Sequence, residues 1–189
     1  MPDLDHFGFI APWYDRAMPY REGEKLASLL SLPISGWLLD AGGGTGRVAQ
    51  AIRGKAAQII VADLSLGMLK QAKNKNGLLC ACSASEQIPF RDGVFERVIM
   101  VDAFHHVKDQ ARTAAELYRV LKPGGFLVVI EPDIRMWAVK LIAIMEKILL
   151  MRSHFLPAER IASLFSMPNA ATRIDREGYE FRIVIEKSP

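Results

Sequence analysis

The sequence predicts an α/β fold, a mostly parallel sheet with helices on both faces, formed by one domain over residues 1–189. The first observation is that the apolar start of Trp37–Val48 runs into a glycine-rich turn and then into a helical pattern. The second is that further apolar segments alternate with amphipathic ones, as strands joined by helices do. The third is a hairpin pattern at the end of the chain, which predicts an antiparallel strand at one edge of the sheet.

Composition places the chain among ordinary soluble globular proteins. Half of its residues are hydrophobic and 24% are charged, and the formal net charge is +3 at pH 7. The basic residues are scattered rather than arranged in a stripe, so we expect no nucleic-acid partner. No basic segment followed by an apolar one opens the sequence, so we expect no secretory signal and a cytoplasmic location.

The glycine-rich turn is the feature around which the other segments are placed. Asp40 lies at the carboxyl edge of the first strand, and Gly42, Gly44 and Gly46 follow at every second position. Glycines let the backbone approach a ligand closely, and the N-terminus of the next helix offers free N–H groups. Glycines alone are equally typical of a flexible surface turn. The preceding strand, the following helical pattern and Asp63, about twenty residues further on, favour a binding turn.

The first 20 residues form an N-terminal arm with an unusual density of apolar and aromatic side chains. Such a face has to be covered, either because a helix packs on the sheet edge or because the arm is a lid over a bound ligand. Both alternatives stay open. A second amphipathic helix is predicted over Arg21–Leu32, with Pro33 beyond its end. The residues that give the arm its character are His6, Phe7, Phe9, Ile10, Trp13, Tyr14 and Met18.

Strands and helices alternate after the glycine turn. A helix that ends near Arg53 leads into a strand over Gln58–Asp63, and Ser65 caps a helix over Leu66–Lys75. Leu78–Cys82 is a third short apolar strand. This rhythm predicts a parallel sheet.

The two cysteines, Cys80 and Cys82, lie two residues apart in that third strand. Neighbours at this spacing cannot form an unstrained disulfide, so we expect buried, reduced thiols. A metal site would need more ligands at a recognised spacing, so none is expected.

Polar residues gather where the fourth strand ends. Ser83–Gly93 is predicted to be a loop, and the strand Val94–Asp102 runs into Asp102, His105 and His106. Ligands of open α/β sheets bind at the carboxyl ends of the strands, so these residues are candidates for a site. The remaining predicted elements are a helix capped by Asp109 that stops at Lys122–Gly125, a strand over Phe126–Ile130, a helix over Pro157–Phe165, and a hairpin of Ala171–Asp175 and Tyr179–Lys187.

A helix predicted over Asp133–Arg152 is the most apolar of the chain. Its longest uncharged stretch, Leu141–Met145, is far shorter than the roughly 20 apolar residues that a membrane span needs. A helix that is apolar nearly all round still has to be covered. The cover is the domain itself, a partner subunit, or a lipid-like substrate or membrane surface.

Five segments resemble the motifs of the class I S-adenosylmethionine-dependent methyltransferases, especially the ubiquinone and menaquinone biosynthesis C-methyltransferases. Leu39–Gly46 is similar to the first motif of that family, Val61–Ser65 to its acidic second-strand motif, and Ile88–Phe95 to its loop motif. Arg119–Gly125 matches the motif before the fifth strand, and Ile10–Asp15 resembles the segment that opens many members. The resemblance implies a Rossmann-like seven-stranded sheet whose last strand is antiparallel, with S-adenosylmethionine as the cofactor.

The resemblance also implies a role for each residue of the binding site. The three glycines would lie against the methionine portion of the cofactor, and Asp63 would accept hydrogen bonds from both ribose hydroxyls. Many relatives have an aspartate for the adenine amino group where this chain has Ala84, so Ser85 or Glu86 would have to substitute. The complete set of cofactor-binding residues is Asp40 for the ammonium group, Gly42, Gly44, Gly46, Asp63, Leu64 and Met68 beside the adenine, Ala84, Ser85, and Asp102 facing the methionyl end.

For catalysis, the protein mainly has to align an acceptor with the methyl group and exclude water. His105 or His106 is the candidate base, with Tyr14 as a group of the lid, although either histidine could instead bind the loop backbone. The expected acceptor is small and hydrophobic, such as a quinone precursor, with residues 133–166 forming a helical insertion over the acceptor site. Peripheral membrane contact and a homodimer stay open.

Two other functions stay open at this point. One is a non-catalytic S-adenosylmethionine-binding subunit that regulates a partner. The other is an NAD(P)-dependent oxidoreductase, because Gly44–Ala49 satisfies the looser dinucleotide pattern G-x-G-x-x-A. Asp40 before the glycines and the Lys-Pro-Gly-Gly segment argue against the oxidoreductase.

Overall fold

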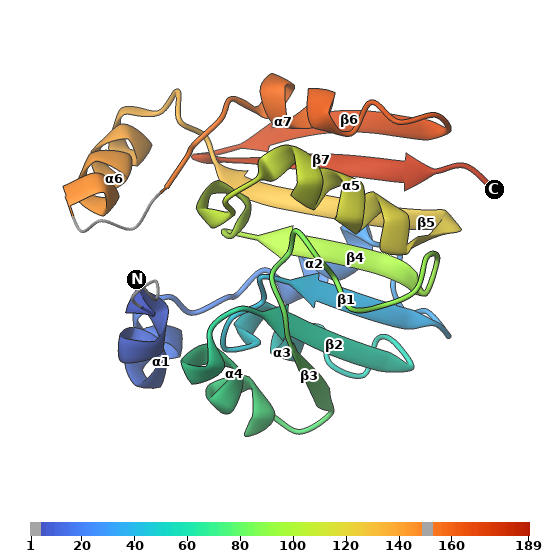
Figure 1. Ribbon diagram of the computed structural model, residues 1–189, viewed down its shortest axis with the longest axis horizontal. Helices are drawn as coiled ribbons and strands as arrows, with labels where there is room; N and C mark the ends of the chain where they lie inside the picture. The colour runs from blue at the N-terminus through green and yellow to red at the C-terminus, as the bar shows by residue number, and fades with distance from the viewer. Residues whose placement is uncertain (1–4, 149–152) are drawn as a thin grey trace.

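The computed structural model describes residues 5–148 and 153–189 and contains one seven-stranded sheet (Figure 1). The strand order is β3-β2-β1-β4-β5-β7-β6. β7 runs antiparallel to both of its neighbours, and the pairs from β3 to β5 are all parallel. The predicted fold class is therefore confirmed. The strands are β1 (Trp37–Ala41), β2 (Gln58–Asp63), β3 (Leu78–Cys82), β4 (Phe95–Val101), β5 (Leu121–Pro132), β6 (Ala170–Glu177) and β7 (Glu180–Lys187).

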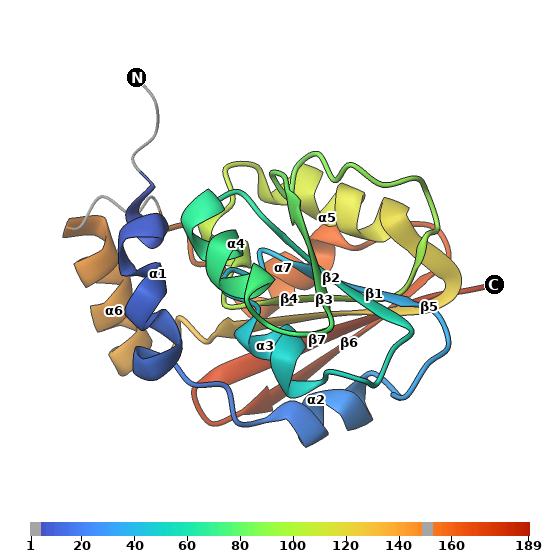
Figure 2. The ribbon, with the colours of Figure 1, turned by 90° about the horizontal axis from the view of Figure 1, so that it is seen from below.

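Helices cover both faces of this sheet (Figure 2). One core lies under α5 and α7 and includes Leu117 and Phe165, and the other lies under α2 and α3 and includes Leu26 and Ile52. α4 packs along β2 and β3 at the edge. The helices are α1 (His6–Ala17), α2 (Gly23–Leu29), α3 (Arg47–Ala51), α4 (Leu66–Lys73), the 3-10 turn η1 (Phe104–His106), α5 (Gln110–Val120), α6 (Trp137–Ile148) and α7 (Ala158–Leu164).

The strand order reverses between β1 and β4. From β1 the chain moves outward to β2 and β3, and it then returns to form β4 on the other side of β1. The loops after β1 and β4 therefore diverge at the carboxyl ends of two adjacent strands, which is where open α/β sheets bind ligands. This geometry brings the glycine turn and the loop at residues 102–106 to the same edge.

The helix caps follow the local sequence. The hydroxyl of Ser65 accepts a hydrogen bond from the backbone N–H of Met68, at 3.2 Å. The carboxylate of Asp109 accepts one from the backbone N–H of Arg112, at 2.9 Å. Both were predicted as N-caps, because short polar side chains satisfy the free N–H groups of the first helical turn. β5 is longer than predicted, because Leu121 pairs with Phe95 and brings the Lys-Pro-Gly-Gly segment into the strand.

The expectation of buried thiols is wrong. Cys80 and Cys82 are both exposed and reduced. β3 is the outermost strand of the sheet, so one of its edges has no neighbouring strand, and Leu79 beside the cysteines is half exposed as well. An apolar run in an edge strand does not imply burial. In the part of the chain that the structure describes, no group of three His, Cys, Asp or Glu side chains could hold a metal ion.

The two most apolar helices are only half covered. α1 turns Ala11 inward but exposes Trp13, and α6 turns Val139 inward but exposes Trp137. Within the described part of the chain itself, the rings of Phe9 and Trp13 in the arm are not covered. The helix predicted up to Arg152 is described as far as Ile148, and residues 149–152 lie outside the described residues. None of the described helices is long and apolar enough to cross a membrane.

Candidate functional site

The glycine loop follows β1 and has a backbone that only glycine adopts readily. Gly42, Gly44 and Gly46 have φ values of 64°, 55° and 72°. A Cβ atom on Gly42 would lie 2.7 Å from the Cβ of Ala103, and one on Gly46 would lie 2.9 Å from Cδ1 of Leu78. At Gly44 the nearest atoms would be 3.9 Å away. A side chain at Gly42 would thus press on Ala103 and one at Gly46 would have to displace the end of Leu78, whereas the backbone at Gly44 is less crowded, so a ligand could lie against it.

Asp63 ends β2 and is bound to this loop. Its Oδ2 accepts a hydrogen bond from the N–H of Gly44, and its Oδ1 accepts one from the N–H of Ser65, both at 2.8 Å. Burial raises the pKa of Asp63, although these backbone donors favour the charged form. An ionised carboxylate has about four acceptor sites, so the oxygens of Asp63 retain capacity for two ligand hydroxyls. The position fits the predicted ribose-binding role.

Asp40 is buried in β1 with one oxygen unsatisfied. Its side chain is 1% exposed, and Oδ2 has no hydrogen-bond partner among the described residues. Burial raises the pKa of Asp40 to about 7, against the opposing charge of Arg47. A buried polar atom without a partner is costly, so it points to a missing donor. The ammonium group of an amino-acid ligand would supply that donor, and the residues present therefore fit S-adenosylmethionine.

The predicted adenine region lies beside α4 and the loop after β3. Leu64 is exposed, so its side chain can cover a flat ligand. Met68 is buried, and its sulfur lies close to Gly44, 3.9 Å from where a Cβ of that residue would be. Ser83 donates its N–H to the carbonyl of Asp63, which brings Ala84 and Ser85 close to the end of β2. One carboxylate oxygen of Glu86, Oε1, is already engaged, because it accepts hydrogen bonds from the backbone N–H groups of Lys108 and Asp109 at the start of α5.

A partly buried ion pair, which the sequence prediction missed, joins the glycine loop to the loop after β4. The guanidinium of Arg47 lies 2.6 Å from Oδ2 of Asp102, and 5.9 and 5.6 Å from the ring centres of Tyr14 and Tyr20. Asp102 has a φ of 52°, which is unusual for a residue other than glycine. A cation in the first turn of a helix opposes the helix dipole, and this is a signal that Arg47 needs an acidic partner.

Glu131 is a second residue that the sequence prediction missed. Its Oε1 accepts hydrogen bonds from the N–H groups of Ala103 and Phe104, at 2.9 and 2.7 Å, and its Oε2 pairs with Nδ1 of His105. His105 is buried, and its ring stacks on Phe155 at 4.2 Å. Glu131 therefore clamps the loop after β4, and His105 is part of that clamp.

His106 faces different neighbours. Its Nδ1 lies 3.2 Å from the hydroxyl of Ser153, and its ring meets the edge of Phe7 at 4.9 Å. The two histidine rings lie 4.0 Å apart. His106 thus touches both α1 and the segment after α6, the two parts of the chain predicted to cover the site.

α1 is tied over the glycine loop and α4. The carboxylate of Asp15 accepts a hydrogen bond from the hydroxyl of Thr45 and pairs with Lys75 at 2.6 Å, while Asp5 accepts one from Ser65 at 2.8 Å. A Cβ on Gly67 of α4 would lie 2.5 Å from Cα of Gly8 in α1, so this helix crossing needs glycine. These contacts hold Tyr14 against Arg47, and burial raises the pKa of Tyr14.

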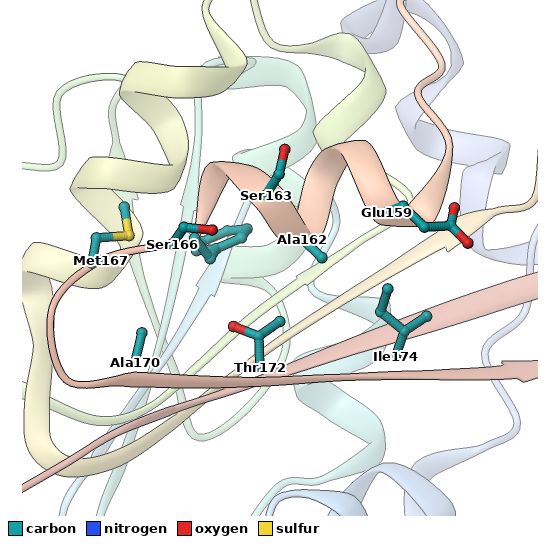
Figure 3. Close-up of a pocket in the computed structure, with 9 residues that line it drawn as sticks. Glu159, Ala162, Ser163, Ser166, Met167, Ala170, Thr172 and Ile174 are labelled. Atoms are coloured by element: carbon teal, nitrogen blue, oxygen red, sulfur yellow. The ribbon is translucent and has the colours of Figure 1, made fainter.

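Two surface hollows lie elsewhere. Figure 3 shows one between α7 and β6, where Glu159, the acid among its labelled residues, pairs with Arg176. The other is lined by residues 35–37 and 89–94, at the amino end of β1. Neither contains the glycine loop, Asp63 or the histidines. The chemistry of the site therefore points to the carboxyl edge of the sheet and not to these hollows.

Comparisons with known proteins agree with this geometry. A family model described as a methyltransferase domain matches residues 39–129. A ubiquinone/menaquinone biosynthesis C-methyltransferase of Haemophilus ducreyi is 32% identical over 144 residues, which is 69% of this chain and 51% of that protein. One from Coxiella burnetii is 26% identical over 144 residues, 69% of this chain and 53% of that protein. The chain spans about half the length of these relatives.

Solved structures share the fold over nearly the whole chain. A SAM-dependent methyltransferase from Thermotoga maritima is 22% identical, with a TM-score of 0.78, and covers 96% of this chain and 98% of its own. One from Aquifex aeolicus is 18% identical, with a TM-score of 0.66, and covers 88% of this chain and 89% of its own. At these identities the likeness extends to the fold alone.

Proposed function

Because the chain belongs to the class I S-adenosylmethionine-dependent methyltransferases, we propose that it transfers a methyl group from that cofactor to a small, hydrophobic acceptor. The observation that carries the proposal is the buried Asp40 oxygen without a partner, next to open backbone at Gly44. Together they would bind an amino-acid tail beside a ribose site at Asp63. A dinucleotide has no ammonium group to satisfy Asp40.

The cofactor supplies a methyl group already activated by its sulfonium, so a strong acid or base is not required. The residues of this chain would bind and orient it. Asp40 would accept the ammonium, Asp63 the ribose hydroxyls, and Leu64 would cover the adenine. Asp102 would face the methionyl end, held there by Arg47.

We assign the two histidines different roles. His105 is a positioning residue, since its Nδ1 is bound by Glu131 and its ring is buried. His106 is the candidate base, because it lies between α1 and the segment after α6. If the acceptor is a ring carbon, it would exchange its ring proton for the methyl group that the cofactor would supply, and His106 would accept that proton. Tyr14 would act in the lid, on the cofactor side.

The acceptor class rests on two supports. The relatives of this chain are named for C-methylation in ubiquinone and menaquinone biosynthesis. The segment 133–166, which we propose as the cover of the acceptor site, contains the exposed apolar helix α6. A quinone precursor has an apolar body and a nucleophilic ring, so it suits such a cover. We propose the arm at residues 1–20 as the lid on the cofactor side.

The test is transfer of a radiolabelled methyl group to a short-chain naphthoquinol. We expect label in the extracted quinol with the unaltered protein and with Asp175→Ala, a surface control in β6, and more than 100-fold less with Asp63→Ala. His106→Ala should lower kcat while the affinity for the cofactor stays within about twofold. Turnover of His106→Ala at the unaltered rate would remove that residue from the mechanism. Cofactor binding without labelled quinol would reject this acceptor class.

A further inference from the structure

We propose that the outward faces of α1 and α6 form a docking surface for an anionic lipid bilayer. We define this apolar end face by six side chains: Phe9, Trp13, Trp137, Leu141, Ile144 and Met145. The inference goes beyond methyl transfer and does not depend on it.

The six side chains form one stripe on each helix. Phe9 and Trp13 are four residues apart, and Trp137 is followed at helical spacing by the three aliphatic residues of α6. Trp13 is 65% exposed and Trp137 is 73% exposed. Large apolar side chains grouped in this way mark an interaction site, because soluble proteins rarely expose them together. The domain itself does not cover the apolar end face.

Both stripes lie at the same end of the molecule as the candidate site. α1 and α6 lie at the same end of the molecule in both views, the end toward which β4 points (Figures 1 and 2). His106 connects the two helices to the site, since it contacts Phe7 of α1 and Ser153 beyond α6. A hydrophobic molecule held in a bilayer would therefore meet the protein next to the site.

The charges favour an anionic partner. The carboxylate of Asp15 on α1 is paired with Lys75, and Asp5, the N-cap of α1, accepts a hydrogen bond from the hydroxyl of Ser65. Arg16 on α1 and Lys140 on α6 are exposed, and neither has a carboxylate partner among the described side chains. Exposed tryptophans with flanking cations are typical of helices that lie in the plane of a membrane interface. α6 has 12 residues, too few to span a bilayer, so it would lie flat.

A second copy of this chain fits the apolar end face less well. A twofold contact would place the same surface on both sides of the interface and bring the cations of two copies together. An anionic lipid surface offers the opposite charge across the whole face.

The tryptophans provide the test. The chain has three, and Trp37 lies at the start of β1, at the opposite end of that strand from the site. Three variants keep one tryptophan each and have phenylalanine at the other two positions. Vesicles of phosphatidylglycerol with brominated acyl chains should shift the emission of Trp13 and Trp137 to the blue and quench it at least twofold. The emission of Trp37 should change by less than a tenth. Equal quenching of all three would overturn the proposal.

Charge variants distinguish docking through the apolar end face from a general attraction between the basic protein and anionic vesicles. We expect Arg16→Glu with Lys140→Glu to weaken binding to anionic vesicles more than tenfold. The matched control, Arg91→Glu with Lys122→Glu, changes two exposed cations away from this face and should weaken binding less than twofold. Neutral phosphatidylcholine vesicles should bind more than tenfold more weakly than anionic ones. An equal loss in both charge pairs would overturn the proposal.

Self-association is the remaining outcome. Light scattering without lipid should show a monomer at micromolar concentration. A dimer that Leu141→Glu dissociates, together with no binding to anionic vesicles, would assign the apolar end face to a second copy and overturn the proposal. Binding of S-adenosylmethionine by each variant checks its fold, and loss of methyl transfer alone would leave the lipid result unaffected.

Discussion

The glycine loop after β1 and the loop after β4 meet at one edge of the sheet, yet they are held in opposite ways. The first depends on backbone conformation, with positive φ at alternate glycines and a close approach to Ala103. The second depends on side-chain partners distant in sequence, with Glu131 binding Ala103, Phe104 and His105. A backbone-built site admits few residue types, whereas a site clamped by side chains can be assembled from many combinations.

The largest expected effect comes from the contact between the two loops. Gly42→Val would force a side chain against Ala103 at a positive φ, so we expect a loss of about 4 kcal/mol or more in the free energy of unfolding. Gly44→Ala would meet its nearest neighbours only at an ordinary contact distance of 3.9 Å, so it should cost only about 1 kcal/mol for its positive φ and yet weaken S-adenosylmethionine binding strongly. Urea unfolding and calorimetric titration measure the two quantities. Equal stability losses would show that packing does not distinguish these glycines.

We expect the buried carboxyl of Asp40 to lower the folding stability of the ligand-free protein at neutral pH, although the same carboxyl is placed to bind the cofactor. Its pKa is about 7 in the folded chain, against 3.8 ordinarily, so the folded state keeps a proton that the unfolded state loses. The free energy of unfolding should therefore fall by at most about 4 kcal/mol as the pH rises from about 4 to about 7. Above about pH 7 it should stay constant. Asp40→Asn should remove this cost, so its advantage in urea unfolding should be larger at pH 8 than at pH 5.

The same carboxyl should make cofactor binding depend on pH. An ammonium ion prefers the ionised form of Asp40, so the affinity for S-adenosylmethionine should rise between pH 6 and pH 8. Asp40→Asn should bind weakly and lose this dependence. If both proteins show the same pH profile, the ammonium lies elsewhere.

The clamp of the second loop should have a smaller effect. Glu131→Gln removes the charge that binds His105 and two backbone N–H groups, so we expect a loss of about 2 kcal/mol in unfolding free energy. Amide hydrogen exchange at Ala103 and Phe104 should accelerate more than the global change explains. The control Glu159→Gln, on the surface of α7, should change stability by less than about 0.5 kcal/mol.

The smallest expected effect concerns the adenine region. Ala84→Asp would restore an acceptor where many relatives have one, and Glu86 is occupied at the start of α5. We expect a three- to tenfold gain in S-adenosylmethionine affinity, which corresponds to about 1 kcal/mol, the typical net contribution of one hydrogen bond. Ala84→Leu, which has no acceptor, should give no gain. Unchanged affinity with aspartate would mean that other groups bind the adenine.

These differences explain which parts could be predicted from the sequence. Strand alternation, the caps at Ser65 and Asp109 and the glycine loop are local patterns, so their residues could be named in advance. Glu131 and Arg47 could not, because their partners lie 26 and 55 residues away and any of several acids or bases would serve. The exposed cysteines of β3 were mispredicted for a related reason, since an edge strand and an inner strand share one apolar pattern.

The central claim is that the carboxyl edge of the sheet around Asp40 and Asp63 binds S-adenosylmethionine. The most direct measurement is a calorimetric titration of the purified protein at pH 8 with S-adenosylmethionine and, separately, with NADH. We predict one site per chain for S-adenosylmethionine with micromolar affinity, at least 30-fold weaker binding in Asp63→Ala, and no heat with NADH. Saturable binding of NADH without binding of S-adenosylmethionine would contradict the account.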